Sequence, residues 1–376
     1  MSSRTFTGND LNGRTLQVEV EGSRIAAVRE LPHQSGLPRL LPVLTELQHN
    51  GAMGLHYDDI TGPGDLDRIA VTLLKHGVGR CLATLVQKFT PERLDAQRRL
   101  EQIRQQIPKF STLFFGYFQE GIFMSPLEGW RGSHTPDRIL PPDWAVFRRI
   151  DDALDGHIHT VNLAPELPGA MEFLDRAVAA GKKVSLGHCC PDTAAIREAV
   201  KRGADRVTHF GNGAAPTIHR FKNPFWEFLN NDGLKLGLIC DGFHLPPELV
   251  GTALKVKGKK NCYPVSDASK FSGLPPGPYA DGTIVLEPDG FLHVAGQEIL
   301  AGSSRQQDTC VGFLMTKLGF TLEDAWRQCS EIPAEAAGIK LPELKPGEEA
   351  SFIVVTEHGR QASIEETIFL GQSFRP

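Results

Sequence analysis

Residues able to bind a metal ion or to move a proton stand at the ends of several apolar runs in this sequence. Glu120, His188 and His209 each close such a run, and Asp267 closes another. Two histidines and one carboxylate form a ligand set that holds zinc and leaves a coordination position open for water. A neighbouring carboxylate can take a proton from that water and give it to a leaving group. Each residue alone also fits a structural histidine or a capping aspartate, but their convergence would favour a metal-dependent hydrolytic site.

The four residues converge only if the runs are parallel strands of one sheet. From residue 41 onward the runs recur about 20 to 40 residues apart, with helical stretches between several of them, which is typical of repeated strand and helix units. Eight runs predict a closed (β/α)8 barrel of the α/β class, whose active site lies at the carboxyl ends of the strands. The runs span residues 43–48, 80–86, 112–118, 158–163, 183–188, 206–210, 234–240 and 261–266, and the clearest helical stretches span 65–77, 91–107, 169–181 and 192–203.

The two ends of the chain have a different pattern. Residues 15–21 and 24–30 alternate apolar and polar side chains, and the alternation returns after a helix-rich stretch at 303–338. We expect a small β-sandwich domain formed by residues 1–41 and 339–376, beside a barrel domain formed by residues 42–338.

Composition excludes several classes of protein. The 376 residues carry 40 Lys and Arg against 45 Asp and Glu, and no basic stretch is long enough to follow a phosphate backbone, so nucleic acid is not an expected partner. No apolar run approaches the roughly 18 residues of a membrane-spanning helix, and the polar start lacks the apolar segment of a signal peptide. The seven cysteines show no C-x-x-C pair and are expected to be reduced. These features predict a cytoplasmic protein that does not bind membranes.

Two other sequence features resemble metal sites less closely. His157 and His159 have the spacing of a ligand pair, but they open the fourth run, so they are expected at the opposite face of the barrel. Cys189 and Cys190 follow His188 directly, but adjacent side chains leave a strand on opposite faces. We therefore expect neither pair to join the metal site.

Several short segments carry a resemblance to a known family. They are LAPE at residues 163–166, GH at 187–188, TH at 208–209 with Asn212 after it, DGFH at 241–244, SDA at 266–268, LAGSS at 300–304, and PAEAAGI and KPGEEASFIVV near the end. In this order and spacing the chain resembles the N-acetylglucosamine-6-phosphate deacetylases of the amidohydrolase superfamily, from about residue 41 to its end.

The resemblance implies hydrolysis of the acetamide of an N-acetyl amino-sugar 6-phosphate by a homodimeric enzyme. It assigns Glu120, His188 and His209 to one divalent ion, zinc by preference, and Asp267 to the catalytic base and then acid. His134 would help to hold the acetyl carbonyl, and Arg220 would bind the phosphate. Further substrate contacts would come from Ser133, Asn212, Gly213, Asp241, His244, and the backbone of Leu300, Ala301 and Gly302.

The chain also departs from the family pattern. Many members of the superfamily begin the barrel with H-x-H, which holds a second metal, whereas this chain has Gln48 and Asn50 there. Because amides are poor zinc ligands, these vestigial positions imply a site with a single metal. After Arg220 the usual P-G-x-x-G is replaced by FKNPFWEFLNND, which borders the expected phosphate end.

Two alternative functions remain open. The same chemistry could act on another N-acyl substrate, such as an unphosphorylated acetylhexosamine or an N-acyl amino acid. The chain could also be a catalytically silent sugar-binding relative, although Glu120, His188, His209 and Asp267 are all intact.

Overall fold

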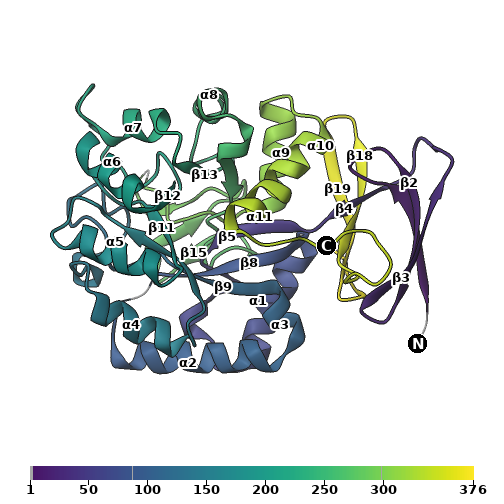
Figure 1. The fold of residues 1–376 in the computed structure, drawn as a ribbon, viewed down its shortest axis with the longest axis horizontal. Helices are drawn as coiled ribbons and strands as arrows, with labels where there is room; N and C mark the ends of the chain where they lie inside the picture. The colour runs from purple at the N-terminus through teal and green to yellow at the C-terminus, as the bar shows by residue number, and fades with distance from the viewer. Residues whose placement is uncertain (1–2, 87, 298) are drawn as a thin grey trace.

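The computed structural model describes residues 3–86, 88–297 and 299–376, and its central sheet is a barrel of eight parallel strands (Figure 1). Neighbouring strands follow one another in chain order. The first and last strands meet, because the Asn50 amide donates to the Ala268 carbonyl at 2.8 Å and the Asp267 amide donates to the Gln48 carbonyl at 3.0 Å. The predicted (β/α)8 barrel is confirmed. Its strands are β5 (Leu44–His49), β8 (Val78–Leu85), β9 (Phe114–Gln119), β10 (Ile158–Leu163), β11 (Lys183–Leu186), β12 (Ala204–Val207), β13 (Lys235–Ile239) and β14 (Cys262–Val265).

Helices cover the outside of the barrel, and the turn chemistry of the sequence marks where they begin and end. Asp192 caps one of them by accepting from the Ala195 amide at 2.8 Å, and that helix ends at Gly203, whose φ of 114° favours glycine. The third strand starts at Phe114, later than the run at 112–118 predicts, because a proline-initiated helix occupies the residues before it. The barrel helices are α1 (Pro63–Lys75), α2 (Pro91–Gln106), α3 (Pro108–Leu113), α4 (Trp144–Ala153), α5 (Ala170–Ala179), α6 (Thr193–Arg202), α7 (Pro224–Asn230) and α8 (Pro247–Lys257).

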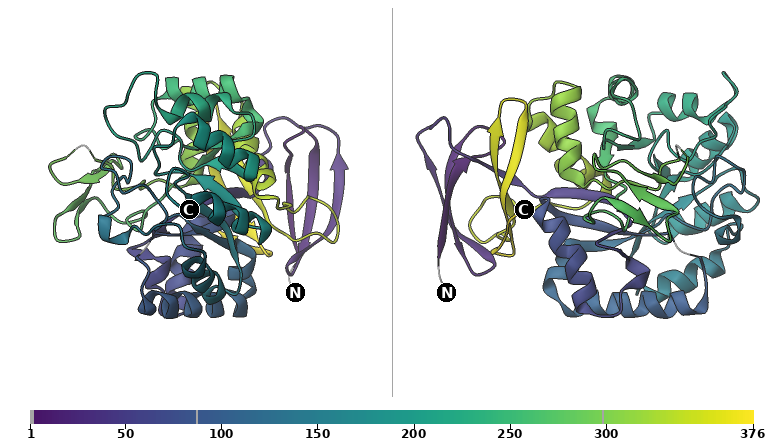
Figure 2. Two further views of the ribbon diagram at one scale, coloured as in Figure 1. Left: turned by 60° about the vertical axis from the view of Figure 1, so that its left-hand side comes forward. Right: turned by 180° about the vertical axis from the view of Figure 1, so that it is seen from behind.

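The two ends of the chain form one sheet of seven strands beside the barrel, where both termini lie (Figure 2). Side chains from both halves of this sheet share a core, and Phe6 meets Phe352 edge to face with ring centroids 5.1 Å apart. A β domain built from both ends is thus confirmed, and its exact boundaries at residues 41 and 338 stay a prediction. In spatial order the strands are β20 (Gln372–Phe374), β19 (Gln361–Phe369), β18 (Phe352–His358), β4 (Arg39–Pro42), β1 (Arg4–Asn9), β2 (Thr15–Glu21) and β3 (Arg24–Leu31).

A small sheet after the last barrel strand was not predicted from the sequence. It consists of β15 (Gly277–Tyr279), β16 (Ile284–Leu286) and β17 (Leu292–Val294), and it projects from the barrel in the left view of Figure 2. Strands of three residues are too short for a recognisable alternation of side chains. The chain then returns to the barrel and enters α9 (Gln307–Lys317), α10 (Leu322–Cys329) and α11 (Glu331–Ala337), which confirms the predicted helix-rich stretch.

Other sequence expectations can be compared with the structure. All seven cysteines lie in the described part of the chain and are unpaired, and all but Cys190 are buried. Within the described residues, no helix has both the length and the hydropathy to cross a membrane. His159 opens β10 as predicted, and its Nε2 lies 2.9 Å from the Ala337 carbonyl, so it ties the barrel floor to α11.

Candidate active site

The backbone is strained where three of the predicted site residues follow their strands. His188, His209 and Asp267 have φ values of 49°, 27° and 49°, a left-handed region that residues other than glycine rarely adopt. Each of them stands two residues after the end of its strand, β11, β12 or β14. Strained backbone of this kind is concentrated at functional sites, where the surrounding structure holds it in place.

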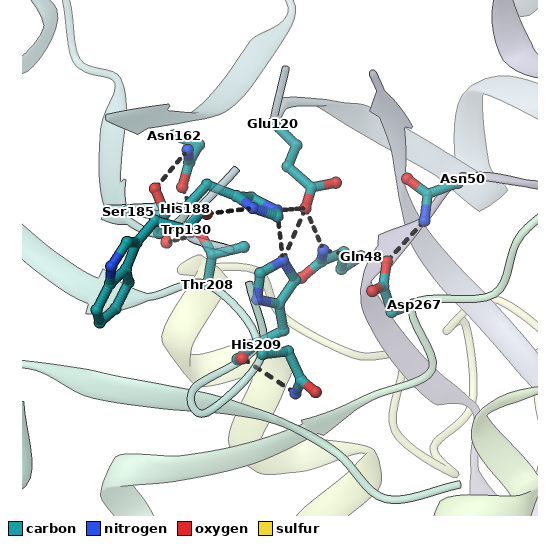
Figure 3. A network of polar contacts seen from close by, with 12 residues as sticks. Gln48, Asn50, Glu120, Trp130, Asn162, Ser185, His188, Thr208, His209 and Asp267 are labelled. Carbon is teal, nitrogen blue, oxygen red and sulfur yellow. Dashed lines mark hydrogen bonds and ion pairs between the residues drawn. The ribbon is translucent and has the colours of Figure 1, made fainter. Parts of the chain in front are cut away.

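Glu120, His188 and His209 bring three ligand atoms together at the mouth of the barrel (Figure 3). The Glu120 Oε1 atom lies 3.3 Å from His188 Nε2 and 2.9 Å from His209 Nε2, and the two Nε2 atoms are 3.0 Å apart. Ligands about 2.0–2.1 Å from a tetrahedral ion would lie roughly 3.3 Å from one another. Both the donor types and their spacing fit a single divalent ion.

The His188 ring is held in this orientation from several sides. Its Nδ1 lies 3.3 Å from the Trp130 carbonyl, which leaves Nε2 to face Glu120. Gly213 and Gly132 approach the ring so closely that a Cβ would lie 2.6 Å and 2.9 Å, respectively, from its atoms. Glycine at these two positions is therefore required by the packing of the ring.

A buried hydrogen-bond network joins the ends of the strands that carry the histidines. The Asn162 amide on β10 donates to the Gly187 carbonyl at 3.1 Å, and the Thr208 hydroxyl donates to Asn162 Oδ1 at 2.8 Å. Ser185 Oγ lies 2.6 Å from the same hydroxyl. Because Gly187 and Thr208 directly precede the two histidines, this network fixes the positions from which both rings project.

Two amides occupy the positions where many superfamily members carry histidines. Gln48 Nε2 lies between Glu120 Oε1 at 3.0 Å and Asp267 Oδ1 at 3.1 Å, and Asn50 Nδ2 donates to Asp267 Oδ1 at 2.6 Å (Figure 3). Both donors therefore meet one oxygen of the Asp267 carboxylate.

The two carboxylates of the site have opposite pKa shifts. Burial raises the pKa of Glu120, but hydrogen bonds from His188 and His209 and their charges outweigh it and hold that pKa well below its usual range. Burial and the charge of Glu120 raise the pKa of Asp267 to about 6. Opposite shifts in neighbouring acids are typical of a site that divides ligand and proton-transfer roles between them.

His134 lies beside this centre. Its ring meets the His188 ring edge to face with centroids 4.9 Å apart, and the ligand atoms of Glu120, His134 and His188 lie within 4.8 Å of one another. Burial, together with the charge of His188, lowers the pKa of His134 to about 3, so this ring is neutral near pH 7. Ser133, its neighbour, is exposed.

The remaining predicted residues surround the mouth at different depths. Asp241 Oδ2 lies 2.7 Å from His244 Nδ1, which orients that ring. The Asn212 side chain donates back to the His209 carbonyl at 3.2 Å. The segment formed by Leu300, Ala301 and Gly302 runs beside the last barrel strand, because the Ser303 amide donates to the Asp267 carbonyl at 3.1 Å.

Arg220 lies apart from these groups. It is exposed, its guanidinium lies 5.9 Å from the centroid of the Phe221 ring, and Phe221 is itself 75% exposed. The Trp226 Nε1 group donates to the Arg220 carbonyl at 2.9 Å, so the loop folds back on α7.

Sequence reasoning missed Asn162 and Trp130 as supports of the site. Asn162 carried a usable signal, because it is a polar residue between Val161 and Leu163 near the carboxyl end of the run at 158–163. Trp130 gave no signal in the sequence, because it contacts His188 through its backbone carbonyl and not through its side chain.

Comparisons with known proteins show which family the chain resembles. The chain is 30% identical over 338 residues to the N-acetylglucosamine-6-phosphate deacetylase of Mus musculus, covering 85% of this chain and 80% of that protein. It is 27% identical over 345 residues to the N-acetylgalactosamine-6-phosphate deacetylase of Escherichia coli O157:H7, covering 90% of both. The fold matches a mutant N-acetyl-D-glucosamine-6-phosphate deacetylase from Mycobacterium smegmatis, solved with N-acetyl-D-glucosamine-6-phosphate, with a TM-score of 0.87, 24% identity and complete coverage of both chains. No protein-family model matches the chain.

Proposed function

Since the chain belongs to the N-acetylglucosamine-6-phosphate deacetylase family of the amidohydrolase superfamily, we propose that it hydrolyses the acetamide of an N-acetyl amino-sugar 6-phosphate to the free amine and acetate. The observation that carries the proposal is the meeting of Glu120, His188 and His209 within 3.3 Å, beside an Asp267 carboxylate held by two amides. This arrangement supports both a ligand set and a separate proton-transfer group.

In the proposed site Glu120, His188 and His209 hold one divalent ion, and nitrogen and carboxylate ligands favour zinc among the candidates. When bound, such an ion polarises a carbonyl group and makes water a stronger nucleophile at neutral pH. Gln48 and Asn50 are proposed to take no part as ligands, because their amide groups donate to carboxylates instead.

Asp267 is proposed to move the proton. With Oδ1 engaged by both amides, Oδ2 is the oxygen available to take a proton from the attacking water as the carbon–oxygen bond forms. The same group then gives the proton to the nitrogen as the carbon–nitrogen bond breaks, which restores the carboxylate. The pKa of about 6 supports a group that can exist in both states near neutral pH.

The other side chains are proposed to bind and orient the sugar. His134, neutral and next to His188, would donate to the acetyl carbonyl, and His244, oriented by Asp241, would meet a sugar hydroxyl. Ser133, Asn212, Gly213 and the backbone at 300–302 would form the walls of the pocket, and Arg220 stays a candidate for the phosphate.

The proposal extends to the whole protein. We propose a cytoplasmic homodimer in which residues 42–338 form the catalytic barrel and residues 1–41 and 339–376 form the accompanying β domain. Seven unpaired cysteines support a reducing compartment, and sedimentation of the purified protein would test the dimer.

Acetate release from purified, metal-loaded protein tests the function. N-acetylglucosamine 6-phosphate should yield acetate and free amine in equal amounts, and the galactosamine epimer, the unphosphorylated sugar and an N-acyl amino acid serve as competing substrates. Faster turnover of an unphosphorylated substrate would favour the alternative N-acyl hydrolase. Bound metal without acetate release from any of them would identify a silent relative.

A further inference from the structure

The first and last strands of the barrel meet at a seam that ends beside the candidate proton-transfer group. β5 and β14 stand at opposite ends of the hydrogen-bonded strand order of the sheet. The backbone hydrogen bond from the Asp267 amide to the Gln48 carbonyl, at 3.0 Å, lies beyond the last residue of β14. The approach of the two strands at this point therefore depends on side chains as well as on the backbone.

Glu46, a residue of β5, accepts hydrogen bonds from both sides of this seam. Its Oε1 atom accepts from the Gln48 amide at 2.8 Å, and its Oε2 atom accepts from the Ser266 amide at 2.9 Å. Ser266 directly precedes Asp267, whose own amide donates to the Gln48 carbonyl. The three hydrogen bonds form a closed ring, and the side chains of two residues of this ring, Gln48 and Asp267, meet at 3.1 Å in the site (Figure 3).

β5 is irregular at the same place. Three residue steps along β5, from Glu46 to His49, face two steps along β8, so β5 carries one extra residue there. Such a bulge leaves a residue outside the regular ladder and changes the direction of a side chain. The Glu46 carboxyl group gives the Gln48 amide an acceptor within this bulge, and the Gln48 side chain reaches both carboxylates of the site.

Glu46 is fully buried, where a carboxyl group is costly. Burial raises the pKa of Glu46 to about 8, against hydrogen bonds from the Ser266 side chain and from the Gln48 and Ser266 amides. An apolar side chain would avoid this cost, but it would leave two buried amides without an acceptor. A carboxyl group offers one oxygen to each amide, whereas the side chain of a glutamine offers a single oxygen.

A second buried side chain joins the two strands lower along the seam. Gln307, in the first turn of α9, donates from Nε2 to the Thr45 carbonyl at 3.1 Å and to the Pro264 carbonyl at 3.0 Å. Thr45 directly precedes Glu46, and Pro264 belongs to β14. Glu46 therefore joins the strands at the level nearest the site, and Gln307 joins them below it.

We propose that Glu46 is a positioning residue for the reaction, whose carboxyl group fixes the ends of β5 and β14 so that the Gln48 side chain holds Asp267 in the orientation that proton transfer needs. This inference rests on the proposed function, to which the role of Asp267 belongs. Glu46 acts through the backbone of its neighbours and contacts neither the ion nor the sugar.

Kinetics of two Glu46 variants on N-acetylglucosamine 6-phosphate test the role. Glu46→Gln keeps the size of the side chain but loses one acceptor oxygen, so kcat of the folded, metal-loaded enzyme should fall about 10- to 100-fold, with KM and metal content nearly unchanged. Glu46→Asp keeps both oxygens on a shorter side chain, so kcat should fall less, about 2- to 10-fold. An unchanged kcat in Glu46→Gln, or a loss that appears in KM alone, would overturn the proposal. If Glu46→Gln does not fold, the same outcomes in Glu46→Asp decide.

Ser330→Ala is the matched control, at the other end of the same strand. The buried Ser330 hydroxyl donates to the Val43 carbonyl at 2.7 Å, directly before β5. Its loss should lower Tm, because a buried carbonyl loses its donor, but it should leave kcat unchanged. A fall in kcat equal to that of Glu46→Gln would mean that any weakening of β5 has this effect, and it would overturn the positioning role.

Amide hydrogen exchange separates failure of this inference from failure of the proposed function, because it needs no turnover. Peptides that contain Gln48 or Ser266 should exchange at least about tenfold faster in Glu46→Gln, and at the unaltered rate in Ser330→Ala. If the unaltered protein releases no acetate from any substrate, the proposed function is wrong, and this exchange pattern still supports Glu46 as the group that fixes the two strand ends. Equal exchange in Glu46→Gln and the unaltered protein would refute the inference, whatever the activity.

Discussion

At the scale of single residues, the surroundings of Asp267 distinguish its two carboxylate oxygens. Gln48 and Asn50 both donate to Oδ1, and Glu120 lies just beyond the Gln48 amide. The amides thus hold two carboxylates at close range without a second cation. In the proposed mechanism the orientation of this one side chain matters as much as its charge.

Asp267→Asn should keep the fold and the bound metal, because the amide is nearly isosteric, but it cannot take up a proton. We expect kcat to fall by about 10²- to 10⁴-fold, the range for a general acid–base group. Acetate release and metal content measured on the same sample check this. Near-normal turnover would remove Asp267 from the mechanism.

Asn50→Ala removes the shorter of the two amide hydrogen bonds to Asp267, at 2.6 Å. A hydrogen bond to a charged group contributes about 1.5–3 kcal/mol, so kcat should fall roughly 10- to 100-fold if the bond orients the carboxylate for proton transfer. KM and metal content should change little. A rise in KM with an unchanged kcat would assign Asn50 to substrate binding instead.

At the scale of elements, the site depends on how closely the ends of β10, β11 and β12 approach one another. Asn162 links the residues that directly follow the other two strands, through the Gly187 carbonyl and the Thr208 hydroxyl. A Cβ at Gly187 would lie 2.5 Å from Thr208 Cβ and 2.7 Å from Asn162 Oδ1. The strands can approach this closely only because position 187 has no side chain.

Gly187→Ala should therefore displace His188 and weaken metal binding by about 10- to 100-fold, the range for changes that disturb the support of a ligand. Overpacking should also cost about 1–3 kcal/mol of stability. Metal titration and thermal unfolding measure the two effects.

Gly312→Ala in α9 is the matched control. Nothing lies within 4 Å of a Cβ added at Gly312, and replacing a glycine inside a helix by alanine should stabilise the fold. Equal behaviour of the two variants would contradict the prediction.

The ends of α1 and α9 are joined by a pair whose strength should depend on pH. His76 follows α1 and lies 2.8 Å from Asp308 in the first turn of α9. Burial lowers the pKa of His76, but the hydrogen bond and charge of Asp308 outweigh it and raise that pKa above its ordinary value of 6.5. The pair therefore stabilises the fold fully below about pH 6.5 and loses this contribution as the pH rises through the folded-state pKa.

His76→Gln should lower the free energy of unfolding at pH 6 by less than about 1 kcal/mol, because the pair is partly exposed to solvent. At pH 9 the variant and the unaltered protein should be nearly equal. Urea unfolding at both pH values measures the difference, and Asp308→Asn should reproduce it. An equal loss at both pH values would mean that His76 contributes through packing alone.

At the scale of the whole molecule, the barrel positions the candidate site residues while the β domain joins the two ends of the chain. Trp326 of α10 donates from Nε1 to the Pro42 carbonyl at 2.8 Å, at the point where the chain passes from the β domain into the barrel. Arg39 of β4 pairs with Glu323 of α10 at 2.6 Å. The β domain and the barrel are thus joined by specific polar contacts.

Purified protein should contain one divalent ion per chain. The proposed ligand set at Glu120, His188 and His209 holds one ion, and the Gln48 and Asn50 amides beside it donate to carboxylates and are poor zinc ligands. Chelation should abolish acetate release and lower Tm, because an ion bound only by the folded state stabilises it, and added zinc should restore both. Elemental analysis measures the ratio, and two tightly held ions would contradict the prediction.

The sequence by itself determined the barrel, the β domain at the chain ends and the identity of the metal-site candidates. It could do so because apolar periodicity is local, and because parallel strands bring their carboxyl ends to one face wherever the strands lie. The ends of α5 and α6 could also be predicted from the sequence, because Gly181 and Gly203 follow them and a left-handed residue near a helix end favours glycine.

Only the tertiary structure decided which of these residues touch. The 3.0 Å between the His188 and His209 Nε2 atoms, the position of Gln48 between two carboxylates and the support from Asn162 all depend on strand register and barrel closure. Likewise, sequence spacing did not show that the Arg220 side chain would be exposed. A loop residue's distance from the site depends on long-range packing, which a count of residues along the chain does not contain.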